Sequence, residues 1–89
     1  MTGFIWLTNE DLYKNICKYD IETLEINFLN DKIDLIDIMR TQNIDYNFCF
    51  NYVINNYKSR LTIPKITYLQ PHLNRQTIID YIYKIRNDL

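Results

Sequence analysis

Residues 62–87, TIPKITYLQPHLNRQTIIDYIYKIRN, carry the clearest structural pattern in the chain. Pro64 lies where a short helix can start, because its fixed φ angle suits a first helical turn. Pro71 ends that helix, since the residue before a proline resists helical angles. Asn74 can cap a second, longer helix over residues 75–87. The apolar positions of the two helices and their turn are Ile66, Leu69, Leu73, Ile78 and Ile82.

Four further helices are predicted upstream, where apolar residues recur at helical spacing. Thr8, Asp20 and Asp45 are polar residues that can cap three of them. The last of the four is apolar on every side, which indicates burial, although its aromatic and β-branched residues also permit a strand. The predicted ranges are 9–18, 21–29, 32–41 and 46–58. We therefore expect an all-α fold, with residues 1–89 forming a single small domain of five or six short helices.

The two helices predicted within residues 62–87 resemble the helix-turn-helix family of DNA-binding proteins. As in that family, a short helix leads through a turn with an inward apolar residue, Leu73, to a longer helix capped by Asn74. The resemblance covers about a quarter of the chain. Three features depart from the usual bacterial pattern. The spacing from Ile66 to Leu73 is one residue longer, Pro71 stands in the turn in place of glycine, and Thr67 stands where a small residue normally packs between the helices.

The resemblance implies roles for the polar residues of this pair. The start of the second helix would enter the major groove, where Arg75 suits guanine and Gln76 suits adenine, with Thr77 beside them. Asp80 would face phosphates unfavourably. The phosphate contacts would come from Lys58, Arg60, Lys65 and Lys84. The resemblance predicts DNA as the partner, and RNA is the other nucleic acid that the basic surface could bind. The alternative is a solvated basic surface on an amphipathic helix that only packs against a core.

The charges are unevenly distributed along the chain, although the net charge is −1. Residues 1–57 hold nine acidic and four basic side chains, for a net charge of −5. Residues 58–89 hold six basic and two acidic side chains, for +4. Such asymmetry indicates two surfaces with different tasks, and a chance distribution is the alternative. We therefore expect an acidic half and a basic, helix-turn-helix-like part within the one domain.

Little in the sequence points to catalysis or to a cofactor. The single glycine, Gly3, excludes a glycine-rich phosphate loop. With one histidine and no close cysteine pair, a zinc site is not expected. Cys17 and Cys49 are predicted to be buried as small hydrophobic residues on helices. Asp34 and Asp37 are interpreted as a solvated acidic face. We predict no enzyme, no metal and no cofactor.

A second function permitted by the sequence is a non-catalytic protein–protein interaction module, such as a small subunit or an inhibitor that docks on a larger protein. The acidic half and the eight tyrosines favour it. Trp6 is either an exposed anchor for such a partner, because tryptophan is enriched in binding hot spots, or a core residue. Residues 31–48 are similar to the second helix and following loop of an ankyrin repeat, but no second copy follows at a period of about 33 residues.

The composition also bears on source and location. The chain has no alanine but 15 isoleucines and 11 asparagines. Isoleucine and asparagine have A/T-rich codons, as expected for a large DNA virus, a protist, an organelle or a low-GC bacterium. No apolar run reaches about 18 residues, and the first residues lack the basic start of a signal peptide. We expect an intracellular protein of the cytoplasm or nucleus without a membrane partner, and we leave its oligomeric state open.

Overall fold

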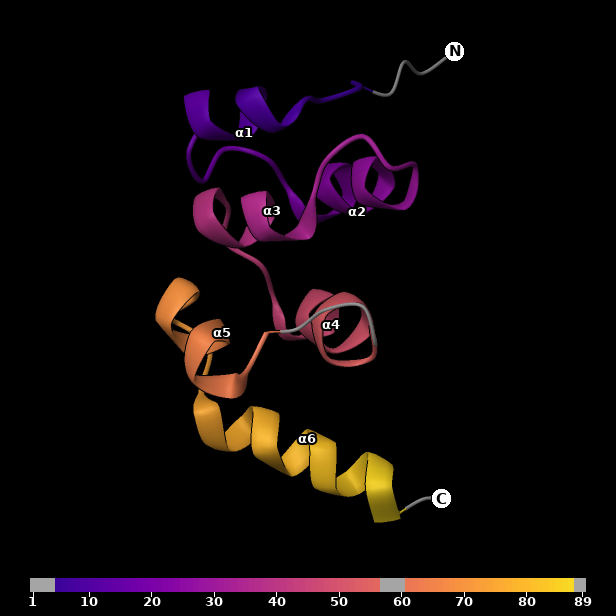
Figure 1. Cartoon of the computed structure of the whole chain (residues 1–89), viewed down its shortest axis with the longest axis vertical. Coiled ribbons are helices and arrows are strands. Elements are labelled where there is room, and N and C mark those ends of the chain that lie inside the picture. The colour runs from indigo at the N-terminus through magenta and orange to yellow at the C-terminus, as the bar shows by residue number, and fades with distance from the viewer. Residues whose placement is uncertain (1–4, 57–60, 88–89) are drawn as a thin grey trace. The chain divides into compact units, whose positions relative to one another are not determined.

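The computed structural model describes residues 5–56 and 61–87, with residues 86 and 87 as backbone only (Figure 1). Every element within these ranges is helical, which confirms the predicted all-α class. The chain divides into two compact units, which we call the N-terminal unit (Met1–Ile44) and the C-terminal unit (Asp45–Leu89). That residues 1–89 form a single domain stays a prediction.

The N-terminal unit contains three helices, of which the first two begin with a side-chain cap. They are α1 (Asn9–Lys14), α2 (Ile21–Leu29) and α3 (Leu35–Thr41). Thr8 and Asp11 form a capping box at the start of α1: the Asp11 N–H donates to Thr8 Oγ1 at 3.2 Å, and the Thr8 N–H donates to Asp11 Oδ2 at 2.9 Å. Asp20 caps α2 by accepting from the Thr23 N–H at 2.8 Å. These two starts lie where the sequence predicts them.

Two buried amides hold the loops of the N-terminal unit against its apolar core. The Asn27 side chain bonds the extended segment before α1, and the Gln42 side chain bonds the segment after α1. Gln42 Oε1 accepts from the Tyr19 N–H at 3.1 Å, and its Nε2 donates to the carbonyl of Asn15 at 3.0 Å. Both amides therefore satisfy backbone groups that a purely apolar core would leave without partners. The buried apolar residues are Leu7, Leu12, Leu24, Ile33, Ile38, Met39 and Ile44.

The first predicted helix is too long at its C-terminal end. It ends at Lys14 rather than at residue 18, because Asn15 Nδ2 bonds the Asp11 carbonyl at 3.0 Å and Cys17 adopts a left-handed φ of 56°. The Cys17 N–H then donates to the Thr41 carbonyl at 2.8 Å. The prediction that Cys17 is buried on a helix is therefore wrong: its side chain is exposed.

The third predicted helix starts too early. It begins at Leu35 rather than at residue 32, since Asp31 has a φ of 58° and the Lys32 N–H donates to the Asn27 carbonyl at 2.9 Å. The Asp34 N–H donates to Asn9 Oδ1 at 2.8 Å. The first three residues of the predicted range thus serve as a loop tied to α1 and α2.

The C-terminal unit begins with a helix that changes its hydrogen bonding after one turn. Asp45 caps α4 (Tyr46–Phe48), as predicted, by accepting from the Phe48 N–H at 2.8 Å. The chain continues as the π-helix η1 (Cys49–Ile54). The predicted helix is therefore present from residue 46, but its hydrogen bonds are of the α type only in its first turn, and the strand alternative is wrong. Residues 57 and 58 lie outside the described residues.

Two further helices complete the C-terminal unit at their predicted positions. They are α5 (Ile63–Leu69) and α6 (Arg75–Asn87). Helix α6 packs against both α5 and η1. The aromatic rings of Phe50 and Tyr81 stack with centroids 3.8 Å apart and planes 3° apart, which joins η1 to α6. The buried apolar residues are Phe48, Cys49, Val53, Ile66, Leu73 and Ile78, so Cys49 is buried as predicted.

Candidate nucleic-acid interface

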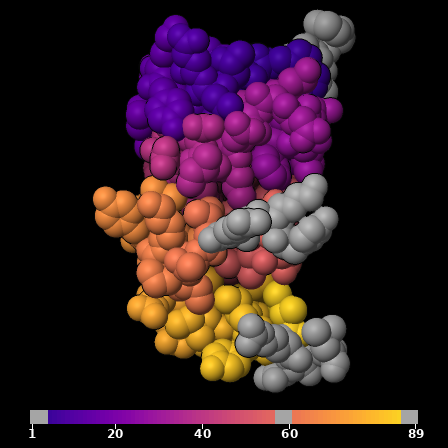
Figure 2. Space-filling model, in the orientation of Figure 1, coloured from indigo at the N-terminus to yellow at the C-terminus, as the bar shows by residue number. Residues whose placement is uncertain are grey.

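Helices α5 and α6 and the turn between them form a unit around three buried side chains. Ile66, Leu73 and Ile78 come from α5, the turn and α6 in that order, and all are buried. Leu69 and Ile82, also predicted to be inward, are half-buried. The inward turn residue required by the helix-turn-helix resemblance is thus present. In the space-filling view, the orange side chains of α5 and the turn lie at the surface of this unit (Figure 2).

Side-chain hydrogen bonds cap the start of each of the two helices. Thr62 caps α5 by accepting from the Lys65 N–H at 3.4 Å. Asn74 Oδ1 accepts from the Thr77 N–H at 3.0 Å, which is the bond expected of a helix cap. The Asn74 N–H donates to the Tyr46 hydroxyl at 2.7 Å, and this bond ties the start of α6 to α4. The first turn of α6 therefore has a defined place on the C-terminal unit.

The two predicted base readers, Arg75 and Gln76, lie at the start of α6 beside Thr77. Arg75, Gln76 and Thr77 are consecutive and all are exposed. Gln76 Nε2 donates to Asp80 Oδ1 at 2.9 Å, one turn further along the same surface. Arg75 and Gln76 can present donors to a ligand. Asp80 both orients Gln76 and places one negative charge beside it.

Two of the four predicted phosphate contacts fall within the described residues. Lys65 on α5 and Lys84 on α6 are both exposed. The Lys65 ammonium lies 5.5 Å from the centroid of the Tyr68 ring, which is cation–π distance. Lys58 and Arg60 lie outside the described residues. The charge asymmetry follows the unit boundary: residues 1–44 hold eight acidic and four basic side chains, and residues 45–89 hold six basic and three acidic ones.

Two exposed tyrosines of this unit were missed by the sequence reasoning. Tyr68 on α5 is 77% exposed and Tyr83 on α6 is 63% exposed. A signal for Tyr68 exists in the sequence: it follows buried Ile66 by two positions, which places it on the far side of a helix. The eight tyrosines favour an interaction module by their number alone, which assigns no role to either position.

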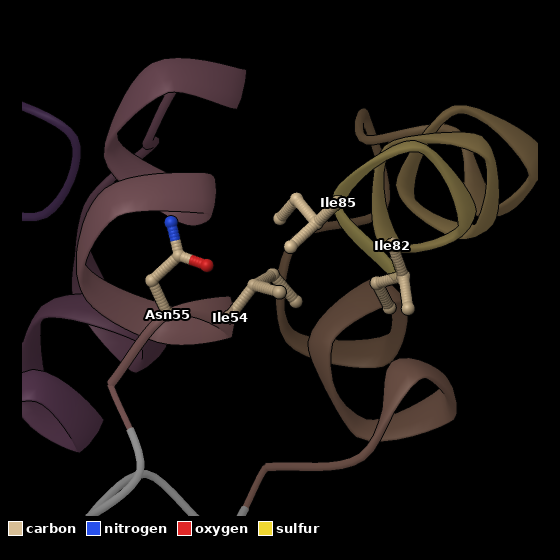
Figure 3. Close-up of a pocket in the computed structure, with 4 residues that line it drawn as sticks. All are labelled: Ile54, Asn55, Ile82 and Ile85. Carbon is tan, nitrogen blue, oxygen red and sulfur yellow. The ribbon is translucent and has the colours of Figure 1, made fainter. Parts of the chain in front are cut away.

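Two shallow hollows lie beside α6. One has a volume of about 280 Å³ and is lined by Ile54, Asn55, Ile82 and Ile85 (Figure 3). The other has a volume of about 340 Å³ and is lined by Ile63, Ile79, Ile82 and Tyr83. The described side chains that line them include no carboxylate, histidine or cysteine. Both hollows can accept an apolar or aromatic group. The described residues that line them are not suited to acid–base chemistry.

The predicted partner anchor, Trp6, lies in the N-terminal unit and is 50% exposed, so the core alternative is wrong. The Lys32 ammonium lies 5.2 Å from its ring centroid. In the predicted acidic face of Asp34 and Asp37, Asp37 Oδ1 accepts from the Tyr13 hydroxyl at 2.6 Å. This hydrogen bond is the main reason that the pKa of Tyr13 is raised above its ordinary value.

Chemistry of other kinds finds little support in the described part of the chain. Over residues 5–56 and 61–87, no cluster of three or more histidine, cysteine, aspartate or glutamate side chains could hold a metal ion. Burial raises the pKa of the Cys49 thiol to about 11, which keeps it protonated and unreactive. Among the described helices, none has the length and apolar character needed to cross a membrane.

No protein-family model, curated protein or solved structure matches the chain.

Proposed function

We propose that the chain is a small nucleic-acid-binding protein that uses the α5–turn–α6 unit, with a regulatory role in transcription or replication. The observation that carries the proposal is the arrangement at the start of α6. Arg75, Gln76 and Thr77 are exposed there, while Ile78, the next residue, is completely buried. The core thus holds the helix in an orientation that turns three hydrogen-bonding side chains outward, as a groove-reading helix requires.

The charge of the C-terminal unit supports the same function. Its six basic and three acidic side chains give a net charge of +3, against −4 for residues 1–44. Positive charge on the unit that holds the reading helix favours binding to phosphates, because association releases condensed counterions. The proposed location is the cytoplasm or nucleus, where nucleic acid is available, and an A/T-rich viral genome is one source that suits the composition.

The test is a binding titration on a labelled random-sequence DNA duplex in low salt. We expect measurable binding that weakens as salt rises, and a loss of about tenfold or more for the double variant Arg75→Ala with Gln76→Ala. The matched control is Lys18→Ala, which removes an exposed positive charge from the N-terminal unit and should leave binding unchanged. No binding in low salt, or an equal loss in the double variant and the control, would overturn the proposal.

A second candidate function is favoured by one specific observation in the N-terminal unit. Of the seven exposed large hydrophobic side chains in the described residues, five lie in this unit, and Trp6 is the largest of them. Tryptophan at a protein surface is a typical binding anchor. This supports a protein-interaction module, such as a small subunit or inhibitor. A partner lost on Trp6→Ala but retained on Tyr68→Ala would support it; a partner retained by both variants would contradict it.

A further inference from the structure

We infer that the exposed face of α5 binds unpaired nucleotides, with Tyr68 as a stacking platform for a base and Lys65 as the contact to the adjoining phosphate. This inference rests on the proposed function and specifies its ligand: single-stranded nucleic acid at α5, in addition to the duplex at α6. It concerns a surface of the C-terminal unit that the helix-turn-helix resemblance does not assign to base recognition.

The exposure of Tyr68 is the first observation. At 77%, it is the most exposed large hydrophobic side chain in the described part of the chain. Ile66, two residues earlier on the same helix, is completely buried and supplies the contact with the core. The Tyr68 ring therefore adds little to folding and lies largely in solvent, with the Lys65 ammonium over one of its faces. A planar, exposed ring on a short helix held by its own cap and core residue is suited to stack on a base.

The position of Lys65 is the second observation. It precedes Tyr68 by three residues, which places the two side chains on the same side of the helix. Its ammonium lies 5.5 Å from the ring centroid, close enough for a cation–π interaction. A nucleotide whose base stacks on the ring brings its phosphate near this ammonium. The pair thus supplies both elements of single-strand binding, an aromatic face and a positive charge.

A second tyrosine and lysine on α6 extend the same chemistry. Tyr83 is 63% exposed and Lys84, next to it, is exposed as well. Tyr83 also borders the hollow of about 340 Å³ lined by Ile63, Ile79 and Ile82. Among the described residues each unit has two exposed aromatic side chains, Trp6 and Tyr13 in the N-terminal unit and Tyr68 and Tyr83 in the C-terminal unit. Only those of the C-terminal unit lie in a part of the chain with net positive charge.

The geometry favours unpaired rather than paired nucleotides at this face. In a duplex, both faces of each base are covered by neighbouring base pairs, so a protruding tyrosine gains no stacking there. In a single strand the base can turn out and stack on the ring, which every base can do regardless of sequence. Tyr68 should therefore contribute to binding of single strands and contribute little to binding of duplexes.

The experiment measures binding of the full chain to a labelled oligothymidine strand and to a duplex of the same length, by fluorescence anisotropy in low salt. We expect Tyr68→Ala to weaken binding to the single strand by about five- to a hundredfold and to leave duplex binding within about twofold. Tyr68→Phe keeps the ring and should stay close to the parent affinity. Lys65→Ala should reduce the salt dependence of single-strand binding by about one phosphate contact.

The matched control is Tyr13→Ala, which removes an exposed tyrosine from the N-terminal unit and should not change binding. An oligouridine strand in the same titration separates RNA from DNA as the source of the unpaired bases. Single-strand binding that is unchanged by Tyr68→Ala, or reduced equally by Tyr68→Phe, would overturn the inference. If the duplex still binds through Arg75 when the single-strand result is negative, only this inference fails. If the chain binds neither the single strand nor the duplex, the proposed function fails as well.

Discussion

The side chain of Asn27 accepts a hydrogen bond of 2.7 Å from the backbone N–H of Leu7, and both residues are buried. The same side chain donates through Nδ2 to the carbonyls of Ile5 and Thr23, each at 2.9 Å. One amide thus joins α2 to the extended segment that precedes α1. Because the Leu7 N–H lies away from water, its hydrogen bond has no ready substitute.

Replacing this amide should destabilise the chain. For Asn27→Ala we expect a loss of about 1–3 kcal/mol in the free energy of unfolding, since a buried N–H is left without its acceptor. Urea denaturation followed by circular dichroism measures it. The control is Asn30→Ala: Asn30 also donates to the carbonyl four residues earlier, at 2.7 Å, but is exposed and should cost less. Equal losses for the two variants would contradict the assigned role of Asn27.

The cap of α2 should make stability depend on acid pH. Hydrogen bonds from the hydroxyl and the backbone N–H of Thr23 hold the pKa of Asp20 below its ordinary value. A lowered pKa in the folded state means that the carboxylate stabilises the fold above its ordinary pKa, and that this contribution is lost as the pH falls through the folded pKa.

The variant Asp20→Asn isolates this effect, because asparagine also caps helices but does not titrate here. We expect the parent protein to lose stability relative to the variant as the pH falls below about 4, with a constant difference near neutral pH. Denaturation curves at a series of pH values measure the difference. Stability differences that stay constant down to acid pH would show that Asp20 does not contribute in this way.

The two cysteines should differ in reactivity. Cys17 is exposed, whereas Cys49 is buried with a pKa raised to about 11. Because the thiolate is the reactive form, we expect one thiol per folded chain to react rapidly with Ellman's reagent and the second to react only on unfolding. Cys17→Ser should remove the rapid reaction. Rapid reaction of two thiols in the folded parent protein would contradict the burial of Cys49.

The stacked rings of Phe50 and Tyr81 should contribute to the stability of the C-terminal unit. Tyr81→Leu removes the stacking and should lower the free energy of unfolding by about 0.5–1.5 kcal/mol beyond the loss of buried area. Tyr81→Phe keeps the ring and removes only the hydroxyl that accepts from Asn55 Nδ2 at 2.9 Å, an exposed hydrogen bond. Thermal denaturation should therefore place the phenylalanine variant close to the parent. A phenylalanine variant as unstable as the leucine variant would assign the effect to the hydroxyl.

Much of the fold could be predicted from local sequence patterns. Thr8, Asp20, Asp45 and Thr62 cap helices where the sequence places the starts, because a cap bond reaches only three residues along the chain. The same holds for the turn between α5 and α6, where proline restricts the backbone locally. The exposed positions of Arg75, Gln76 and Thr77 follow from the same helical period, and their role in binding stays a prediction.

Most of the wrong predictions concern features that depend on contacts between residues far apart in the chain. We predicted the end of α1 and the burial of Cys17 wrongly, because the Cys17 N–H bonds the carbonyl of Thr41, which lies 24 positions later in the chain. The exposure of Trp6 likewise depends on how its segment is tied to Asn27, which no local pattern contains. The π-helix could not be predicted either, since its residues fit a regular helix equally well by propensity.

Local sequence patterns predict the all-α class, most helix starts, the inward residues of the α5–turn–α6 unit and the separation of charge along the chain. The helical features follow from hydrogen bonds and side-chain periodicity that act over one or two helical turns. Contacts between distant residues set which amides are buried, which cysteine faces solvent, and where one compact unit ends and the next begins. These depend on contacts such as that of Gln42 with the Leu12 carbonyl, 30 residues away, which form only when the chain has folded.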